Sequence, residues 1–275
     1  GSTKRDKMTV AQTHVSNWVK AECEKSNRPP VLMLSGGQGI GKTTIMKHLM
    51  QAQQFNLAVL GLDDFYLSAS ERSALAQSVH PLFETRGPPG THHVGLLSET
   101  IDKLVVADKG STTIWPHFDK KSDDVAPESD WRHFSGRPDA IIVEGWLIGV
   151  ASDASAPNQP PINAVEDKDS DGVWREYQED ALATSYSDLW DKAASFFHLD
   201  APDFGAILAW RIQQEEETQG VGGGELSQER QDWVKSFILY YERLTRRMLS
   251  NSRRPGHILK FNETRDPIAF QRFGD

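Results

Sequence analysis

The stretch that most constrains the fold of this chain runs from Val31 to Thr44 and reads VLMLSGGQGIGKTT. Its first four residues are apolar and predict a short buried strand. Gly36 to Thr43 then matches the pattern G-x-x-x-x-G-K-S/T without a mismatch, and Ile45 and Leu49 follow at helical spacing. A glycine-rich turn with a chance lysine is the alternative, but motif and flanks together favour a phosphate-binding loop between a strand and a helix.

Each part of this loop suits an anion. Glycines let successive backbone N–H groups point inward, and the helix N-terminus adds partial positive charge. We expect Lys42 to reach the β- and γ-phosphates of a nucleotide and the Thr43 hydroxyl to coordinate Mg²⁺. The residues expected to bind the nucleotide here are Gly36, Gly37, Gln38, Gly39, Ile40, Gly41, Lys42, Thr43 and Thr44.

Carboxylates follow two other apolar runs. Asp63 and Asp64 come after the expected strand Ala58–Leu62, and Glu144 follows the strand Ala140–Val143 directly. In an open α/β sheet, ligands bind at the carboxyl ends of the strands, and a carboxylate there can hold Mg²⁺. Capping of a turn or helix is the alternative for the two aspartates.

The order of elements predicts the fold class. Strands and helices alternate along most of the chain, which indicates an α/β fold with a mostly parallel sheet and helices on both faces. The expected strands are Val31–Leu34, Ala58–Leu62, Thr113–Trp115, Ala140–Val143, Phe196–Leu199 and His257–Phe261. The expected helices are Val10–Lys25, Ser70–Gln77, Leu96–Val106, Val173–Ala194, Phe204–Glu217 and Leu226–Ser250.

The sequence also predicts the character of several segments between these elements. The proline- and glycine-rich stretch Phe83–His93 predicts a rigid loop, and Phe118–Asp124 by itself would be a solvated turn. Residues 151–172 predict a surface insertion that is partly mobile, and residues 220–224 a flexible break. In the last helix the stripe of Trp233, Phe237, Tyr240, Tyr241 and Leu244 is expected in the core.

Charge and cysteine content exclude some classes of function. The formal net charge is −9, from 30 Lys and Arg against 39 Asp and Glu, so we expect no nucleic-acid and no membrane partner. Cys23 is the only cysteine, which excludes an intrachain disulfide and a cysteine-based zinc site. Since neither a membrane span nor a signal-peptide pattern is found, we expect a cytoplasmic protein.

Four further segments extend the pattern. LDDFYLS follows the second strand, RGPPGTHH lies in a loop, FDKKSDD follows the third strand and VEGW the fourth. With the phosphate-binding loop they resemble the P-loop kinases of the phosphoribulokinase, uridine kinase and pantothenate kinase superfamily. Within it the chain looks most like plant-type D-glycerate 3-kinases and their fungal and bacterial relatives. This chain has His93 where those kinases usually have Asp, and Val125 where they often have Arg.

The resemblance reaches Trp146 and continues more weakly to the segment Asn262–Pro267, NETRDP. It implies a P-loop NTPase fold in a single P-loop kinase domain over residues 1–275. Within that domain we expect an N-terminal helix over residues 1–28, the insertion 151–172 and a helical, lid-like region over residues 204–250.

The resemblance also implies roles. The chain would be an ATP- and Mg²⁺-dependent kinase that phosphorylates a hydroxyl of a small anionic metabolite, with D-glycerate as first candidate. Asp63 aligns with the general base, Lys42 stabilises the transferring phosphoryl group, and Thr43 and Glu144 hold Mg²⁺. Asp64 would be structural, and Arg211 would close over the phosphates. The expected acceptor contacts are Asp63, Tyr66, Arg86, His92, Asp119 and Lys120.

Three alternatives stay open. The first is a sister kinase acting on a nucleoside, pantothenate or a sugar phosphate. The second is a non-catalytic ATP-binding regulatory protein. The third is a scaffold that uses the aromatic helix as a partner surface. A GTPase is disfavoured because no Asn-Lys-x-Asp segment is present. We expect a monomer or homodimer.

Overall fold

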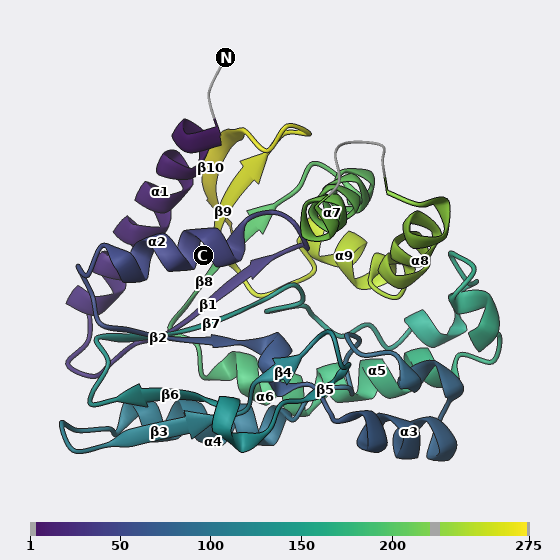
Figure 1. Cartoon of the computed structure of the whole chain (residues 1–275), viewed down its shortest axis with the longest axis horizontal. Helices are drawn as coiled ribbons and strands as arrows, with labels where there is room; N and C mark the ends of the chain where they lie inside the picture. The colour runs from purple at the N-terminus through teal and green to yellow at the C-terminus, as the bar shows by residue number, and fades with distance from the viewer. Residues whose placement is uncertain (1–3, 221–225, 274–275) are drawn as a thin grey trace.

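The centre of the molecule is a six-stranded sheet with the strand order β10-β9-β8-β1-β7-β2. The structure is a computed structural model that describes residues 4–220 and 226–273 (Figure 1). Five of these strands are parallel, and β10 runs antiparallel to β9 at one edge. The strands are β1 (Val31–Gly36), β2 (Leu57–Gly61), β7 (Ala140–Gly145), β8 (Ser195–Asp200), β9 (Gly256–Phe261) and β10 (Pro267–Phe273).

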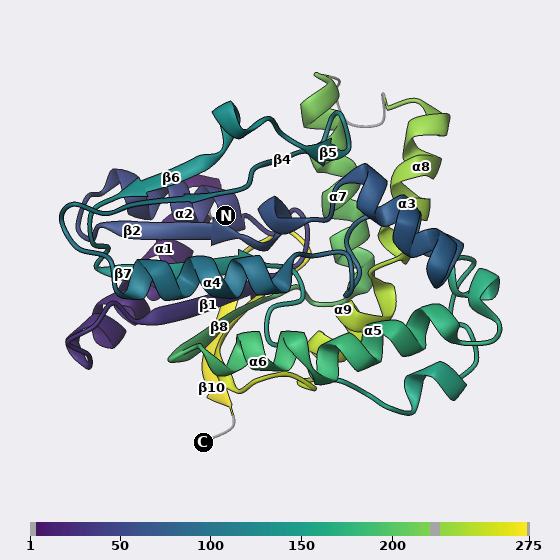
Figure 2. The ribbon, with the colours of Figure 1, turned by 90° about the horizontal axis from the view of Figure 1, so that it is seen from below.

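Helices cover both faces of this sheet, as Figures 1 and 2 show. α1 (Lys4–Glu24) and α2 (Lys42–Gln51) lie over one face, and α4 (Val94–Val105) and α6 (Ser185–Asp191) over the other. Every residue of β1 is buried, because a strand covered on both sides meets water on neither. The expected α/β fold with a mostly parallel sheet is therefore confirmed.

The remaining helices gather beyond the end of the sheet at which the phosphate-binding loop lies, on the right of Figure 1. They are α3 (Ala69–Ser78), α5 (Val173–Ala183), α7 (Phe204–Gln219), α8 (Gln228–Leu239) and α9 (Glu242–Leu249). Short 3-10 turns lie between the elements: η1 (Leu62–Phe65), η2 (Pro81–Glu84), η3 (Glu128–Asp130), η4 (Ala156–Asn158) and η5 (Glu166–Asp169). No described helix is long and apolar enough to span a membrane.

The segment Thr113–Trp115 does not join the main sheet, contrary to expectation. It forms β3 (Thr112–Trp115), which pairs only with β6 (Arg132–Ser135) in a separate antiparallel ribbon. The reason is its alternating pattern, since Trp115 is buried whereas Ile114 is 59% exposed, as suits a ribbon with one face in solvent. Between these strands, β4 (Phe118–Asp119) and β5 (Asp124–Val125) make a second hairpin.

The long helix expected up to Ser250 is two helices. α8 ends at Leu239 and α9 starts at Glu242, so that prediction was wrong. The rings of Tyr240 and Tyr241 at the break pack edge-on against two tryptophans, with centroids 5.8 Å from Trp174 and 4.6 Å from Trp146. At the break the N–H groups of Tyr240 and Tyr241 donate to the carbonyls of Phe237 and Ile238, three residues back, over 3.3 Å and 3.0 Å, so the last turn tightens and α8 ends there.

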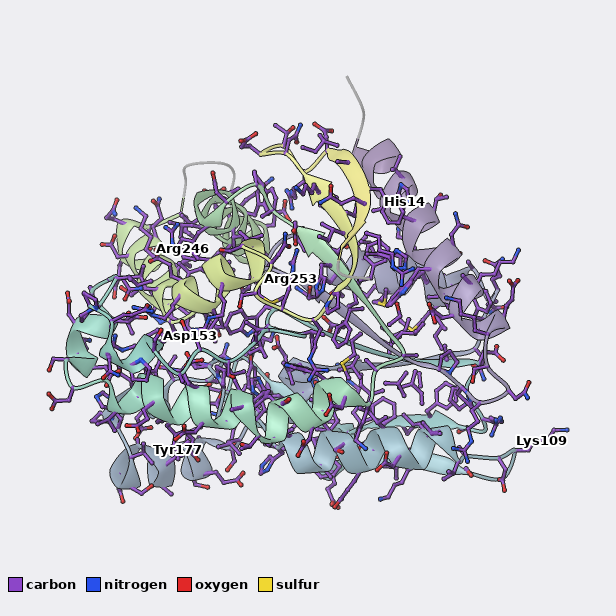
Figure 3. The ribbon with its side chains drawn as sticks, turned by 180° about the vertical axis from the view of Figure 1, so that it is seen from behind. His14, Lys109, Asp153, Tyr177, Arg246 and Arg253 are labelled. Atoms are coloured by element: carbon purple, nitrogen blue, oxygen red, sulfur yellow. The ribbon has the colours of Figure 1, made fainter. Side chains whose placement is uncertain are left out.

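The sequence analysis also missed β10. This last strand follows the turn after β9 and places Phe270 against His14 of α1, with ring centroids 4.3 Å apart. Arg253, labelled in Figure 3, is buried and donates to both carboxylate oxygens of Asp200, the last residue of β8, over 2.7 Å each. These contacts attach the C-terminal hairpin to the rest of the sheet.

The segment 151–172 is anchored more firmly than its composition suggests. Arg175 of α5 donates to Asp169 over 3.0 Å, and Arg243 of α9 donates to Glu166 over 2.7 Å and 2.9 Å. Both carboxylates are buried. Buried ion pairs of this kind are sensitive to loss of one partner, so this segment is a packed part of the fold. Of the expected flexible break at residues 220–224, residues 221–224 lie outside the described residues.

Candidate active site

A cavity of about 1580 Å³ opens at the carboxyl ends of β1, β2 and β7. Its walls come from segments far apart in sequence: the loop before α2, the turn η1, the β4–β5 hairpin, α7, α8 and the turn between β9 and β10. Ligand sites in open α/β sheets form at this edge because loops from several parallel strands meet there. Residues Gln38 to Thr44 line the cavity, whereas Gly36 and Gly37 lie behind them.

The phosphate-binding loop folds as its glycines require. Gly41 precedes α2 with φ of 108°, a left-handed conformation that L side chains rarely adopt. Lys42 then folds back over the loop, and its Nζ donates to the carbonyl oxygens of Gly36 and Gly37, the latter over 3.1 Å. Burial lowers the pKa of Lys42, and the nearby carboxylates of Glu144 and Asp63 oppose that shift. The ammonium is thus placed at the cavity end of the loop.

The start of α2 supplies a second set of donors. The first N–H groups of any helix have no partner inside the helix, and the first three residues of α2, Lys42, Thr43 and Thr44, all line the cavity. No acidic residue occupies this first turn. The helix end therefore suits a phosphate group, and the Thr43 hydroxyl lies beside it as a candidate metal ligand.

Asp63 lies in the turn η1, immediately beyond β2, and its carboxylate has two partners. The Tyr66 hydroxyl donates to Oδ1 over 2.7 Å, and Lys120 Nζ of the β4–β5 hairpin lies 2.9 Å from Oδ2. Burial alone would raise the pKa of Asp63, but the charge and hydrogen bond of Lys120, with the bond from Tyr66, hold it well below its usual range. Asp63 is therefore ionised and can accept a proton.

Asp64 also lines the cavity but has a different set of partners. One of its oxygens accepts from the Phe118 N–H over 3.2 Å and lies 2.9 Å from Nδ1 of His117. Arg132 lies 3.5 Å from the other oxygen. These contacts attach the start of the β4–β5 hairpin to η1, which supports the structural role expected for Asp64.

Glu144 lies near the end of β7, between β1 and β2. In the sheet it stands opposite Leu34 of β1 and Gly61 of β2, so its side chain enters the cavity between the phosphate-binding loop and η1. Burial, with further repulsion from Asp63 and Asp64, raises the pKa of Glu144 to about 7, against the opposing effect of Lys42. A cation beside this carboxylate would stabilise its ionised form.

These residues fit Mg²⁺ only together with a nucleotide. The Thr43 hydroxyl and the carboxylates of Asp63, Asp64 and Glu144 line one cavity. Over the described ranges, however, no three His, Cys, Asp or Glu side chains form a ready-made metal site. Mg²⁺ is commonly held by one or two carboxylates plus substrate phosphates. Thr43 and Glu144 are the residues that would supply the protein's share.

Arg86 also lines the cavity, between two aromatic rings. Its guanidinium carbon lies 5.6 Å from the ring centre of Phe118 and 5.4 Å from that of Phe237. Nη1 donates to Asp123 over 2.7 Å, and the same carboxylate binds the buried Arg72 over 2.7 Å. Since one carboxylate serves two guanidinium groups, a net positive charge is left at this part of the cavity.

The helices α7 and α8 bring further charged groups over the cavity. Glu215 accepts from Arg211 over 3.0 Å within α7 and from Arg230 of α8 over 2.6 Å. Arg230 also stacks on Trp233, with its guanidinium carbon 4.0 Å from the ring centre. Arg211 thus lines the cavity as expected, tied to α8 through one carboxylate.

The aromatic stripe of α8 belongs to this wall. Trp233, Phe237 and Tyr241 line the cavity: Tyr241 belongs to the core and Phe237 packs against it, as expected, whereas Trp233 is 40% exposed, contrary to the expectation. Periodicity could not separate the two roles, because a cavity wall and a core use the same helical spacing. An interaction surface for a scaffold is also disfavoured, since Tyr241 is 2% exposed.

Known proteins match this chain over most of its length. No protein-family model matches it. An uncharacterised kinase of Schizosaccharomyces pombe, mug58, is 24% identical over 93% of this chain and 96% of its own. The probable ATP-dependent kinase TDA10 of Saccharomyces cerevisiae is 25% identical over 80% of this chain and 79% of its own.

Solved structures match it too. A D-glycerate 3-kinase from Cryptococcus neoformans superposes with a TM-score of 0.77 at 23% identity, over 96% of this chain and 99% of the other. The chain has the fold of a P-loop kinase. The structure of the YGR205w protein superposes with a TM-score of 0.69 at 21% identity, over 96% of both chains. The resemblance expected from the sequence is confirmed, and the kinases named among the relatives support an ATP-dependent kinase.

Within this P-loop kinase fold, two expected acceptor contacts lie differently from the expectation. His92 does not line the cavity: it is buried behind Tyr66, with ring centroids 4.9 Å apart. Burial lowers the pKa of His92 to about 3, so it is neutral and supports Tyr66 from behind. Asp119 reaches the cavity rim, but its carboxylate accepts from the Lys121 N–H and the Ser122 hydroxyl and so closes the hairpin turn.

The other expected contacts come together in the P-loop kinase cavity. Asp63, Tyr66, Arg86 and Lys120 all line it, with Lys42 and Glu144. The sequence analysis missed the pairing of Lys120 with Asp63. A lysine in a charged loop carries no signal of its partner, since the contact depends on how the β4–β5 hairpin folds over η1.

Proposed function

We propose that this chain is an ATP- and Mg²⁺-dependent kinase that transfers the γ-phosphoryl group to a hydroxyl of a small anionic metabolite, with D-glycerate as the first candidate. The observation that carries this proposal is one cavity that is lined by Asp63, by the lysine of the phosphate-binding loop and by Arg86. The kinases named among the curated relatives support the reaction class. The fold shared with a D-glycerate 3-kinase supports the choice of first acceptor.

Phosphoryl transfer needs positioning and charge stabilisation more than covalent help from the protein. The loop from Gly36 to Thr44 would hold the triphosphate with its N–H groups and with the first turn of α2. Lys42 would neutralise charge that develops on the γ-phosphoryl oxygens. Mg²⁺, held by Thr43 and Glu144, would supply further neutralisation of the phosphates. Arg211 would add positive charge from α7 over the same region.

Asp63 would accept the proton of the acceptor hydroxyl. A carboxylate with a low pKa can take this role, because in a loose transition state the proton leaves late and the base mainly orients the hydroxyl. Tyr66 and Lys120 would keep Asp63 ionised and fix its direction through their 2.7 Å and 2.9 Å contacts. The acceptor hydroxyl would then lie between Asp63 and the end of the phosphate-binding loop.

Arg86 would bind the anionic part of the acceptor. A planar guanidinium can hold a carboxylate through two parallel hydrogen bonds, and the rings of Phe118 and Phe237 restrict its plane. The prolines Pro88 and Pro89 stiffen the loop that carries it, so less conformational freedom is lost on binding. Lys120 would contribute a second positive charge on the same side.

The experiment that tests this function is a screen of ATP-dependent ADP release. The purified chain would be assayed with D-glycerate and other small hydroxy acids, with nucleosides, with pantothenate and with sugar phosphates, beside Lys42→Ala as the inactive control. Release stimulated by D-glycerate, and lost in the control, is the expected result. Stimulation by a nucleoside or pantothenate would assign a sister kinase. ATP binding without stimulation by any acceptor would assign a regulatory nucleotide-binding protein.

A further inference from the structure

The turn between β9 and β10 holds an arginine in an unusual conformation. Arg265 has φ of +59°, in the left-handed region that side chains other than Gly, Asn and Asp seldom occupy. The turn enforces this: Asn262 Oδ1 accepts from the N–H groups of Thr264 and Asp266 over 3.1 Å and 2.9 Å. The Arg265 N–H also donates to the Asn262 carbonyl over 3.0 Å. Strain of this kind is commonly retained where a side chain must be aimed.

The side chain of Arg265 reaches the phosphate-binding loop. Its Nη1 donates to the carbonyl oxygen of Gly39 over 2.9 Å, and its Nη2 donates to Gln213 Oε1 of α7 over 2.8 Å. The guanidinium carbon lies 5.8 Å from the ring centre of Trp210, whose Nε1 donates to the Glu263 carbonyl over 2.9 Å. One guanidinium therefore joins the loop, α7 and the C-terminal hairpin.

Gly39 accepts this arrangement because it lacks a side chain. Its φ is +78°, and an added Cβ would lie 2.9 Å from Trp210 Cβ and 3.1 Å from the Trp210 backbone. The loop thus packs directly on α7 at the residue whose carbonyl Arg265 binds. The position of this carbonyl is set by two contacts, one from the helix and one from the turn.

The Gly39 carbonyl also determines the direction of a loop donor. The Gly39 oxygen and the Ile40 N–H belong to one planar trans peptide, so they point in opposite directions. With the oxygen directed at Arg265, the N–H faces the inside of the loop, where it meets the Gly37 carbonyl at a long 3.4 Å. A long bond of this kind is readily exchanged for a stronger one to a phosphate oxygen.

We propose that Arg265 is a positioning residue for the nucleotide: it fixes the Gly39–Ile40 peptide so that the Ile40 N–H faces the bound phosphates. The inference rests on the proposed function, because ATP is the ligand that this loop would bind. It also gives a role to the segment Asn262–Pro267, which is part of the resemblance to the P-loop kinases. Arg265 acts through Gly39, and its left-handed conformation is the cost of aiming it there.

Arg265→Gly separates this role from a structural one. Glycine adopts φ of +59° without strain, and this relief offsets part of the stability that is lost with the two hydrogen bonds of Arg265, so the variant should melt within a few degrees of the wild type. It lacks the guanidinium, so we expect ATP affinity, measured by calorimetry, to fall about tenfold. Amide hydrogen exchange over residues 36–44 of the nucleotide-free chain should become faster. Arg265→Lys keeps the charge but cannot make both bonds, so its ATP affinity and its exchange rate should lie between those of the wild type and those of Arg265→Gly.

Gln53→Gly is the matched control. Gln53 has φ of +51°, is exposed and follows α2 outside the cavity. Its substitution relieves the same kind of strain and should leave ATP affinity and exchange over residues 36–44 as in the wild type.

Three results would overturn the proposal. The first is unchanged exchange and unchanged ATP affinity in Arg265→Gly. The second is lost affinity with unchanged exchange in the nucleotide-free chain, which would make Arg265 a direct nucleotide contact. The third is a lowered melting temperature that accounts for the faster exchange, as a structural residue would give. If the wild type binds no ATP, the proposed function fails, while the exchange measurement still decides whether Arg265 orders the loop.

Discussion

Lys120 Nζ lies 2.9 Å from Oδ2 of Asp63, so the candidate base is paired with a cation supplied by a different hairpin. The side chains are 60% and 40% exposed, so solvent screens part of the attraction between them and the pair adds only modestly to stability. The same attraction raises the pKa of Lys120 and, with the bond from Tyr66, lowers that of Asp63 against the opposing effect of desolvation. The hairpin thus favours the ionised form of the candidate base.

We predict that Lys120→Met moves the acid limb of the pH–rate profile to higher pH. Asp63 must be ionised to accept a proton, and without the cation its pKa rises, so activity is lost earlier as the pH falls. The measurement is kcat/KM against pH at saturating Mg²⁺, because Glu144 has a pKa of about 7 without metal and would otherwise define the acid limb. Lys121→Met removes a neighbouring charge that does not pair with Asp63 and should leave the acid limb in place. Equal shifts in both variants would contradict the pairing as the cause.

Asp63→Asn should lower turnover by ~10²-fold or more, because an amide cannot take the proton. ATP affinity should be nearly unchanged, since Asp63 lies beyond the phosphate-binding loop. Asp64→Asn should be milder and should act mainly on the acceptor KM, because Asp64 holds the start of the β4–β5 hairpin. Steady-state kinetics of the two variants decide the roles, and the reverse pattern would exchange them.

Lys42→Ala should cost ~2–3 kcal/mol at the transition state, the scale of losing one stabilising donor. The variant also loses the two bonds from Nζ to the loop carbonyls of Gly36 and Gly37, so ATP affinity should fall as well. Turnover and nucleotide binding of the purified variant are the measurements. Wild-type turnover would be incompatible with the proposed role of the loop.

Glu144→Gln should separate the effect of Glu144 on the stability of the fold from its proposed role in binding Mg²⁺. The folded-state pKa of about 7 lies above the model-compound value of 4.5, so the folded state binds this proton more tightly than the unfolded state. The stabilisation of the folded state by this proton is therefore fully present below about pH 4.5 and is lost as the pH rises through 7. Glutamine cannot ionise, so at pH 8 without Mg²⁺ the variant should melt several degrees above the wild type, with little difference at acid pH.

The same variant should need more Mg²⁺ for activity, since one metal-binding carboxylate is gone. In the wild type, protons compete with the metal at Glu144, so the apparent Mg²⁺ affinity should weaken as the pH falls below about 7. Mg²⁺ titrations of activity at pH 6 and pH 8 test both statements. An unchanged Mg²⁺ requirement in Glu144→Gln would remove Glu144 from the metal site.

Arg86→Lys should raise the acceptor KM far more than the ATP KM. A lysine keeps the charge but loses the planar group that lies between Phe118 and Phe237, and it cannot bind a carboxylate through two bonds. Phe237→Leu removes one of the two rings and should give a smaller effect of the same kind. Turnover that is indifferent to Arg86→Lys, with a neutral nucleoside as the preferred acceptor, would refute an anionic acceptor site.

Local patterns in the chain were sufficient for the parallel sheet and for the centre of the site. The run Val31–Leu34 is apolar at every position because both faces of β1 are covered, and the glycines and Lys42 follow in the order that the motif requires. Asp63 and Glu144 could be assigned to the site because each ends a buried strand, and parallel strands end at one edge.

Contacts between distant segments could not be predicted from local sequence patterns. The pairing of Lys120 with Asp63, the ring of Phe237 on Arg86 and the bond from Arg265 to Gly39 each join elements that no local pattern relates. The sequence by itself therefore determined the fold class, the phosphate-binding loop and the two strand-end carboxylates, because these depend on propensity, periodicity and local spacing. Only the tertiary structure decided which cation pairs with Asp63, which aromatic residues line the cavity and which arginine binds the loop, because those depend on how hairpins and helices pack across the open end of the sheet.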